Sequence, residues 1–376
     1  MIISKQKKIC FLLPAWLTKV VGGSEYQVYL LSEQLLKNCW QIEVITNNGP
    51  IQFQQYHNPS IKYYFLKQSK SYVLNYFKIL LLLFKTDSYF YYVRTDARIM
   101  RGALLLYSFL TRKKVIYALA GDDELYKNSY LKYHLSKRIS LKRVIKIIDA
   151  LICDFIIRFR KNKIDLIITQ TIHQQKLLFK NKGMKSIVIP NSYIKINRID
   201  DYNPKKKNIV LWVGNMREVK RPNLFIDLAK LISRQEWDFV MIGEAGKYLN
   251  KVQDNSEFIK FLGPLSYEKT IEWFKIAKIL VNTSTTEGFP NTFIQAWNNN
   301  VLVISLVVDP DNVLTEDKMG LYAYGDFNTL KKILEDAIRK YKIYQDIITH
   351  AYNYSSNKYD ITINTKRFEE ELICLN

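Results

Sequence analysis

Short apolar runs recur along the chain, and most of them are separated by segments long enough to form a helix. The first runs, at 9–13 and 42–46, enclose a loop with Gly22 and Gly23 and a helical stretch over 24–37, which we expect Ser24 to cap. This order predicts a βαβ unit. Similar runs follow at 61–65, 89–93, 114–118, 164–169 and 186–189. The alternation predicts a parallel sheet with helices on its faces.

A polar, lysine-rich stretch over 197–208 interrupts this rhythm and predicts a linker. A second set of apolar runs follows, and three of them end in glycine, at Gly214, Gly243 and Gly263. Glycine at the end of a strand lets the backbone turn beside a ligand. The runs lie at 209–213, 237–242, 258–262, 278–282 and 301–305. We therefore expect an α/β fold of two Rossmann-like, doubly wound domains that face a central cleft.

The length of 376 residues also favours two domains, because a single core usually stops growing at about 250–300 residues. The N-terminal domain is expected over 1–195, the linker over 196–208 and the C-terminal domain over 209–355. A final helix over 356–376 is expected to pack back toward the N-terminal domain.

The composition changes this picture little. Four scattered cysteines without a CxxC pair, and few histidines, predict neither a metal site nor a disulfide framework. Three lysines precede the run 9–13, which is short and lacks a small-residue cleavage site, so we interpret it as a strand and not a signal peptide. The uninterrupted apolar core of 72–84 is too short for a bilayer, which needs about 20 residues.

The charge is divided unevenly along the chain. Residues 1–195 hold 32 Lys and Arg against 11 Asp and Glu, whereas 196–376 hold 24 of each. The whole formal charge of +21 thus belongs to the first half, which favours an anionic partner there: nucleic acid, a membrane or a phosphate-bearing acceptor. The stretch 141–163 interleaves apolar and basic residues and predicts an amphipathic helix, either facing the core with a solvated basic side or docking on a membrane surface.

Two loops in the second half carry residues suited to an anionic ligand. The loop 213–222 brings Arg217, Lys220 and Arg221 to the end of a strand, where they either hold a diphosphate or are solvated. In the loop 285–295, Glu287 precedes a helix start, and Gln295 lies two helical turns deeper. Glu287 is either a site residue or a buried structural carboxylate. After Gly288, the backbone N–H groups of Phe289, Asn291 and Thr292 are expected to point at bound anionic groups, whereas Pro290 has no N–H.

On these motifs the chain resembles the retaining glycosyltransferases of family 4, which have the GT-B fold, and among them the bacterial capsule, O-antigen and exopolysaccharide enzymes. The resemblance covers nearly the whole chain and rests on the segments 22–25, 189–192, 213–220, 287–292 and 307–311. It implies transfer of a sugar from a nucleoside-diphosphate sugar, a UDP-sugar in preference to GDP-mannose, to a surface glycan. The basic first half, the amphipathic stretch 141–163 and the lack of an expected spanning segment indicate that this glycan is lipid-linked. The resemblance also implies a retained anomeric configuration, no metal and no cofactor beyond the donor.

The resemblance assigns roles residue by residue. Lys220 matches the lysine that holds the donor diphosphate, and Glu287 matches the acid over the donor sugar. Gly22 and Gly23 are implied to approach the diphosphate from the opposite domain. The Gly214 loop and the amides of 288–292 are implied to complete the donor pocket.

The chain departs from the family pattern at three places. Gln295 replaces the glutamate that holds the ribose. Asn215 replaces an arginine, so Arg217 either substitutes for it or is solvated. The histidine that the family often has in the first domain is missing, and Asp122 is expected to take part of its role.

We therefore expect a cytoplasmic enzyme, peripheral on the inner face of the cytoplasmic membrane. Its expected partners are a nucleotide sugar, a lipid-linked oligosaccharide and an anionic membrane surface that meets the basic N-terminal domain. Nucleic acid is not expected, since no RNA-binding motif is present. The alternatives are a non-catalytic GT-B homologue, a basic nucleic-acid-binding protein and a nucleotide-sugar epimerase.

Overall fold

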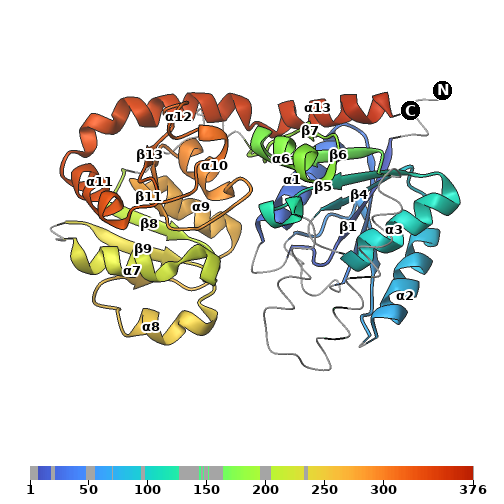
Figure 1. The fold of residues 1–376 in the computed structure, drawn as a ribbon, viewed down its shortest axis with the longest axis horizontal. Coiled ribbons are helices and arrows are strands. Elements are labelled where there is room, and N and C mark those ends of the chain that lie inside the picture. Colours follow the sequence, from blue (N-terminus) through green and yellow to red (C-terminus); the bar gives the residue numbers. More distant parts are fainter. Residues whose placement is uncertain are drawn as a thin grey trace. The chain divides into compact units, whose positions relative to one another are not determined.

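The chain forms two compact α/β units (Figure 1). The first is built from the described parts of 1–18 and 22–190 together with residues from Asn364 on, and the second from the described parts of 191–363. The computed structural model describes residues 7–17, 22–47, 56–69, 71–94, 98–126, 164–194, 205–232 and 236–375, with the single positions 144, 147 and 151. The amphipathic helix expected over 141–163 thus falls outside the described residues, apart from those positions.

The first unit contains a seven-stranded parallel sheet in the order β3-β2-β1-β4-β5-β6-β7. The direction of winding reverses between β1 and β4, which is the doubly wound arrangement that the apolar runs predict. The strands are β1 (Lys8–Leu13), β2 (Gln41–Thr46), β3 (Ile61–Phe65), β4 (Phe90–Arg94), β5 (Lys114–Ala118), β6 (Leu166–Thr169) and β7 (Ile187–Val188). The helices are α1 (Gly23–Lys37), α2 (Tyr72–Lys85), α3 (Arg98–Thr111), the short 3-10 turn η3 (Asp122–Leu125), α6 (Ile172–Lys182) and most of α13 (Ile361–Cys374).

The expected cap of α1 is wrong. Gly22, not Ser24, is the N-cap, with extended φ and ψ of −77° and 145°. Its carbonyl accepts a hydrogen bond from the Tyr26 amide at 3.0 Å, so Ser24 lies inside the first turn. The Glu25 carboxylate fills the space that a side chain at Gly22 would take, and a carboxylate at this end of the helix is favourable.

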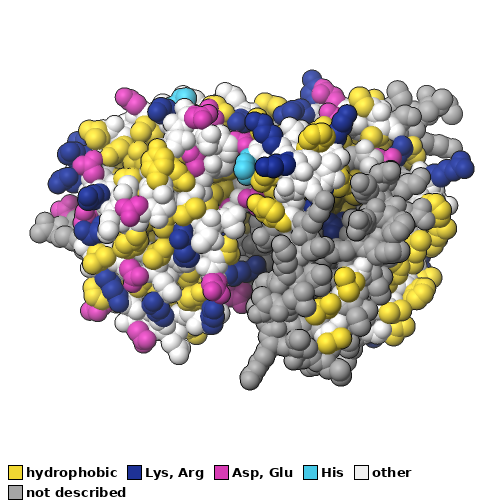
Figure 2. Space-filling model, viewed as in Figure 1, with side chains coloured by type: hydrophobic (Ala, Val, Ile, Leu, Met, Phe, Trp, Pro, Cys, Tyr) yellow, Lys and Arg dark blue, Asp and Glu magenta, His cyan; other side chains and the backbone are white. Residues whose placement is uncertain are grey.

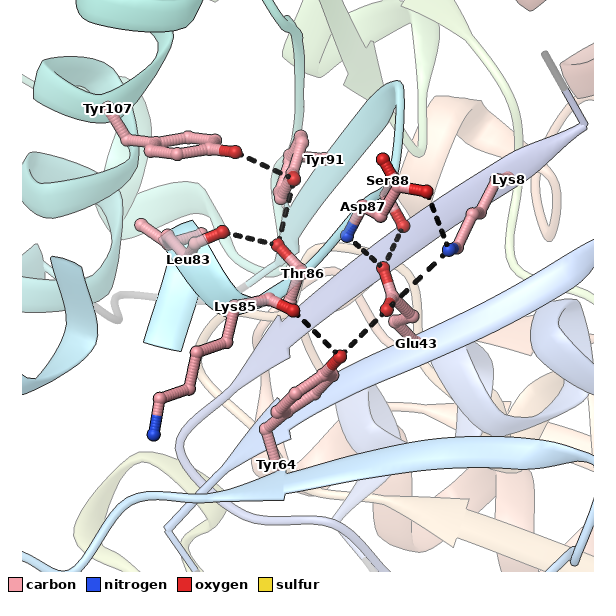
Figure 3. Close-up of polar contacts among 10 residues, drawn as sticks. All are labelled: Lys8, Glu43, Tyr64, Leu83, Lys85, Thr86, Asp87, Ser88, Tyr91 and Tyr107. Carbon is pink, nitrogen blue, oxygen red and sulfur yellow. Dashed lines mark hydrogen bonds and ion pairs between the residues drawn. The ribbon is translucent and has the colours of Figure 1, made fainter. Parts of the chain in front are cut away.

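A buried carboxylate ties three strands and a loop of the first unit together (Figure 3). Glu43 on β2 is 1% exposed. Its Oε1 accepts from the Tyr64 hydroxyl at 2.9 Å, and its Oε2 accepts from the Ser88 hydroxyl at 2.6 Å and the Asp87 amide at 3.1 Å. The Lys8 ammonium lies 3.9 Å from Oε1. Because Glu43 stands near the amino end of β2, it stabilises the end of the sheet opposite to the usual ligand side.

Replacing Glu43 by glutamine is expected to destabilise the protein by about 2–4 kcal/mol, because the new amide group would oppose donors that now meet a carboxylate. The free energy of unfolding in urea measures this. The exposed Glu370 gives a matched control, and Glu370→Gln should change it by less than about 0.5 kcal/mol. Equal values for the two variants would mean that this network adds nothing to stability.

The second unit contains a six-stranded parallel sheet in the order β10-β9-β8-β11-β12-β13, again as the sequence predicts. Its strands are β8 (Ile209–Val213), β9 (Asp238–Ile242), β10 (Lys260–Phe261), β11 (Ile279–Asn282), β12 (Leu302–Ser305) and β13 (Leu321–Tyr322). Its helices are α7 (Pro222–Leu231), α8 (Leu249–Gln253), α9 (Tyr267–Ile276), α10 (Asn291–Asn298), α11 (Phe327–Arg339) and α12 (Gln345–Lys358). Its 3-10 turns are η6 (Glu218–Lys220), η7 (Gly246–Tyr248), η8 (Pro310–Asn312) and η9 (Tyr341–Tyr344).

Two apolar layers hold these helices to opposite faces of the second sheet. One layer contains Phe225 of α7 and Leu330 of α11. The other contains Phe274 of α9 and Trp297 of α10, together with Ala351 of α12. Helices on both faces leave the carboxyl ends of the central strands open to their loops, which is where a doubly wound sheet binds ligands.

The stretch expected as one final helix contains the end of α12 and the whole of α13. The last turns of α13 belong to the first unit, where Glu369 accepts from the Trp40 indole and the Asn38 side-chain amide, each at 2.6 Å. The Phe368 ring also meets Tyr92 edge-on. Within the ranges that the structure describes, no helix is both long and apolar enough to span a bilayer.

Candidate functional site

Two loops of the second unit meet at the carboxyl ends of β8 and β11, which are neighbours in the sheet. Lys220 comes from the loop after β8, and Glu287 from the loop after β11. The Lys220 Nζ lies 2.7 Å from the Glu287 Oε2, and the two side chains are 27% and 14% exposed. This partial burial makes the pair stronger than an ion pair on the open surface, which is typically worth about 0–1 kcal/mol.

The Glu287 carboxylate is fixed on its other oxygen as well. Oε1 accepts from the Asn282 side-chain amide at 2.9 Å and from the Ser284 hydroxyl at 2.7 Å. Asn282 is the last residue of β11, and its Oδ1 accepts from the Ser284 backbone amide at 3.0 Å. The carboxylate is therefore held by the end of a strand, which is more rigid than a loop alone.

The backbone at Lys220 is held by the same neighbouring strand end. The Thr283 hydroxyl donates to the Lys220 carbonyl at 2.7 Å and accepts from the Trp212 indole at 3.0 Å. The Thr285 amide donates to the Val219 carbonyl at 2.8 Å. Trp212 is buried on β8, so the two loops are joined to each other and to the core.

The three cations of the loop 213–222 have different surroundings. Arg221 adopts a left-handed backbone with φ of 45°, and its Nε and Nη2 donate to the carbonyls of Thr283 and Ser284 at 2.7 and 3.2 Å. Burial lowers the pKa of its guanidinium. Arg217 is exposed just before η6. Of these three side chains, Lys220 is the one that faces Glu287. The sequence did not predict that Arg221 joins its loop to the loop after β11 by hydrogen bonds.

Gly214 and Asn215 position the loop after β8 against the loop after β9. Gly243 ends β9 with φ of 140°, and a Cβ there would lie 2.0 Å from the Gly214 carbonyl oxygen, so the two strand ends approach closely only because Gly243 has no side chain. The Asn215 Oδ1 accepts from the Glu244 amide at 3.2 Å. Asn215 thus holds the loop after β9, a role that its position in the sequence did not indicate.

Helix α10 begins beside the Lys220–Glu287 pair, with Pro290 as its N-cap. The Phe289 side chain is buried against Trp297 and Tyr359, which leaves only its backbone to a ligand. Asn191, in the segment 189–192 for which the sequence predicted no particular role, donates to the Phe289 carbonyl at 3.1 Å and to the Asn291 Oδ1 at 2.8 Å.

The remaining predicted residues of this segment follow the same helix. Gly288 lies between Glu287 and the cap, and Thr292 lies in the first turn. Gln295 is half-buried in the next turn, and its carbonyl accepts from the Asn299 side-chain amide at 2.8 Å. The structure therefore gathers Lys220, Glu287 and the start of α10 at one edge of the sheet.

Three predicted residues belong to the first unit. Gly22 and Gly23 stand where α1 begins, after β1. Asp122 stands in η3 after β5, and its Oδ1 accepts from the Gln174 side-chain amide at 2.9 Å. The expected approach of these residues to a donor held by the second unit stays a prediction.

The segment 307–311 has a structural carboxylate. The Asp309 Oδ1 accepts from the Leu314 amide at 2.8 Å, and its Oδ2 accepts from the Thr315 hydroxyl at 2.7 Å and amide at 3.2 Å. Among the residues that the structure describes, no group of three or more His, Cys, Asp or Glu could hold a metal ion.

Comparisons with known proteins bear on the family and the fold. Residues 195–354 match the model of the family "Glycosyl transferases group 1", a range that contains Lys220, Glu287 and the start of α10. The whole fold resembles Anabaena Alr3699/HepE in complex with UDP and glucose, with a TM-score of 0.73 and 15% identity over 98% of this chain and 99% of that one. It also resembles TarM, with a TM-score of 0.74 and 12% identity over 97% and 98% of the two chains. The fold is GT-B, and the family match supports a glycosyltransferase.

Two curated relatives are similar in sequence. The capsular polysaccharide biosynthesis glycosyltransferase CapH of Staphylococcus aureus is 23% identical over 294 residues, which are 74% of this chain and 75% of CapH. The amylovoran biosynthesis glycosyltransferase AmsD of Erwinia amylovora is 29% identical over 108 residues, 27% of this chain. That second match spans only 30% of AmsD.

Proposed function

We propose that the chain is a retaining glycosyltransferase that moves a sugar from a nucleoside-diphosphate sugar to a lipid-linked glycan during the synthesis of a surface polysaccharide, without a metal ion. The Lys220–Glu287 pair at the carboxyl ends of β8 and β11 carries this proposal. It joins one cation and one fixed carboxylate beside a helix N-terminus, within the range that matches the glycosyltransferase family.

Donor binding would break the ion pair, and Lys220 and Glu287 would each bind a different part of the donor. A diphosphate carries more negative charge than one carboxylate and would take the Lys220 ammonium, with the first amides of α10 as further donors. Glu287, still held by Asn282 and Ser284, would then accept from a hydroxyl of the donor sugar. The pair would thus bind the two halves of the donor with its two members.

In the reaction, the bond between the anomeric carbon and the diphosphate oxygen breaks, and its electron pair leaves with the diphosphate. The acceptor hydroxyl oxygen bonds to the same carbon, and its proton passes to the departing diphosphate oxygen. Lys220 would stabilise the charge that grows on the leaving group, and such preorganised electrostatic stabilisation is usually the largest contribution to catalysis.

The preference for UDP-sugars and for a glycan acceptor is supported by the relatives. HepE is described with UDP, glucose and UDP-glucose, and CapH and AmsD are named for capsular polysaccharide and amylovoran synthesis. The basic first half of the sequence suits a phosphate-bearing lipid acceptor at the inner face of the cytoplasmic membrane.

A panel of nucleotides and nucleotide sugars tests this proposal by thermal unfolding. A ligand at about 100 times its Kd adds about 2.7 kcal/mol, so UDP and its sugars should raise the melting temperature visibly. NMR of the product should show the anomeric configuration of the donor, and EDTA should not slow transfer. No response across the panel would indicate a non-catalytic homologue. Interconversion of the free donor without an acceptor would indicate an epimerase. Retarded migration of an oligonucleotide in a gel would indicate a nucleic-acid-binding protein.

Gln295 gives a separate test of how the donor lies. If its side chain meets the ribose, Gln295→Glu should tighten UDP binding roughly fivefold, because a carboxylate accepts a hydroxyl more strongly than an amide. Calorimetric titration measures the Kd, and Gln253→Glu on the exposed side of α8 is the control. Unchanged or weaker binding would place the ribose elsewhere.

A further inference from the structure

Helix α2 presents a stripe of large apolar side chains to solvent. Val73, Leu74, Phe77, Leu81 and Phe84 are 62%, 54%, 59%, 64% and 55% exposed. Their spacing of three and four residues places them along one side of the helix. The helix also buries apolar residues on its inner side, so it is apolar on both sides, which is unusual for the surface of a monomeric soluble domain.

The neighbouring helix α3 extends this surface. The Tyr76 hydroxyl donates to the Gly102 carbonyl at 3.1 Å, and the rings of Phe84 and Tyr107 meet edge-on at 5.0 Å. Phe109 and Leu110, at the same end of α3, are 46% and 61% exposed. We call the seven exposed residues the α2–α3 face; in Figure 2, apolar side chains follow the edge of the molecule where Figure 1 has these helices.

Helices α2 and α3 carry basic residues and no acidic ones. The sequence contains no Asp or Glu over 61–85 or over 98–114. The nearest acid after α2, Asp87, lies 3.4 Å from the Lys8 ammonium. The basic side chains on and beside the two helices include Lys67, Lys78, Lys85, Arg112 and Lys113.

This combination selects one kind of partner. A second copy of the same face would bring basic residues against basic residues with no acid on either helix to pair them, so self-association is disfavoured. An anionic lipid surface instead buries the apolar stripe and attracts its basic surroundings.

We propose that the α2–α3 face docks the first unit onto an anionic lipid surface. The 14 residues of α2 span about 21 Å, less than the ~30 Å hydrocarbon core of a bilayer, so the helix lies in the interface and does not cross it. The inference deepens the proposed function and rests on it for the lipid-linked acceptor. It assigns the docking to α2, in addition to any part played by 141–163.

Sedimentation with vesicles tests the docking. The full chain should bind vesicles of phosphatidylglycerol and phosphatidylcholine, and bind pure phosphatidylcholine more weakly. The double variant Phe77→Ser, Leu81→Ser should lose at least about tenfold in partition coefficient. The matched control is Leu231→Ser, Ile343→Ser in the second unit, where the two side chains are 55% and 64% exposed, and it should bind as the unmodified chain does.

A charge variant separates the two contributions. Lys67→Gln with Lys85→Gln should weaken binding to the anionic vesicles by about fivefold for each charge and leave binding to neutral vesicles unchanged. Salt should weaken binding to the anionic vesicles.

Equal binding by the α2 double variant and the unmodified chain would overturn the proposal. So would a dimer in light scattering that this variant dissociates, since the face would then join two copies. The melting temperature and its rise with UDP should be unchanged in the α2 variant, which shows that the fold and the donor site remain intact. A chain that binds vesicles but no nucleotide would retain the docking and lose the transferase proposal.

Discussion

Replacing Lys220 by alanine is expected to lower kcat about 10²–10³-fold, because the charge that grows on the leaving diphosphate loses its ammonium. UDP binding should weaken in the same variant, since the freed Glu287 carboxylate, 2.7 Å from the present position of Nζ, would repel a diphosphate. Transfer rates at saturating donor and calorimetric titration with UDP measure the two effects. Both kcat and the affinity for UDP should fall.

The exposed Lys269 on α9 gives the control for this variant, and Lys269→Ala should leave both quantities unchanged. The melting temperature without ligand should change little, because the pair is not fully buried and Asn282 and Ser284 still hold the Glu287 carboxylate. A Lys220→Ala enzyme with normal kcat would contradict the role in the leaving group and require another cation, of which Arg217 is the first to test.

Replacing Glu287 by glutamine is expected to separate transfer from nucleotide binding. The kcat/KM for transfer should fall about 10²–10³-fold, because the fixed carboxylate no longer accepts from the donor sugar. UDP, which has no sugar, should bind as well as before or more tightly, because Lys220 no longer has a competing carboxylate. This opposite response of UDP affinity in the two variants is specific to the proposed arrangement.

Glu272→Gln on the exposed side of α9 is the matched control and should leave both measurements unchanged. If Glu287→Gln weakened UDP binding as much as Lys220→Ala does, Glu287 would serve the architecture of the diphosphate site and not the sugar. The double variant then shows whether the two residues act as one unit, because their effects would not add.

The sequence predicts the architecture well because its signal is local. Runs such as 209–213 are apolar on both faces, which is what a strand buried between two layers of helices requires, and they alternate with helix-length segments. The glycines at 214 and 243 mark the ends of β8 and β9. Boundaries were less predictable: Gly22 caps α1 in place of Ser24, because extended backbone geometry and not a side-chain hydroxyl sets that helix start.

The sequence predicted the main residues of the candidate site but not the contacts between them. Lys220 and Glu287 were predicted as separate contributions from two loops, and their contact follows from the strand order, which places β8 beside β11. The sequence alone did not distinguish the surroundings of the three cations in the loop 213–222. A left-handed backbone at Arg221 turns its guanidinium to the carbonyls of Thr283 and Ser284. The preceding residue, Lys220, faces Glu287 instead.

Taken by itself, the sequence determined two doubly wound units, the positions of the loops that carry polar residues, and the uneven charge, because each of these depends on residues close together in the chain. Tertiary structure alone decided which polar groups meet. Asn191 reaches the start of α10, Asn215 holds the loop after β9, and the outer side of α2 stays uncovered. The physical reason is that hydrogen-bond partners and burial are set by packing between distant segments, which no local pattern of residues specifies.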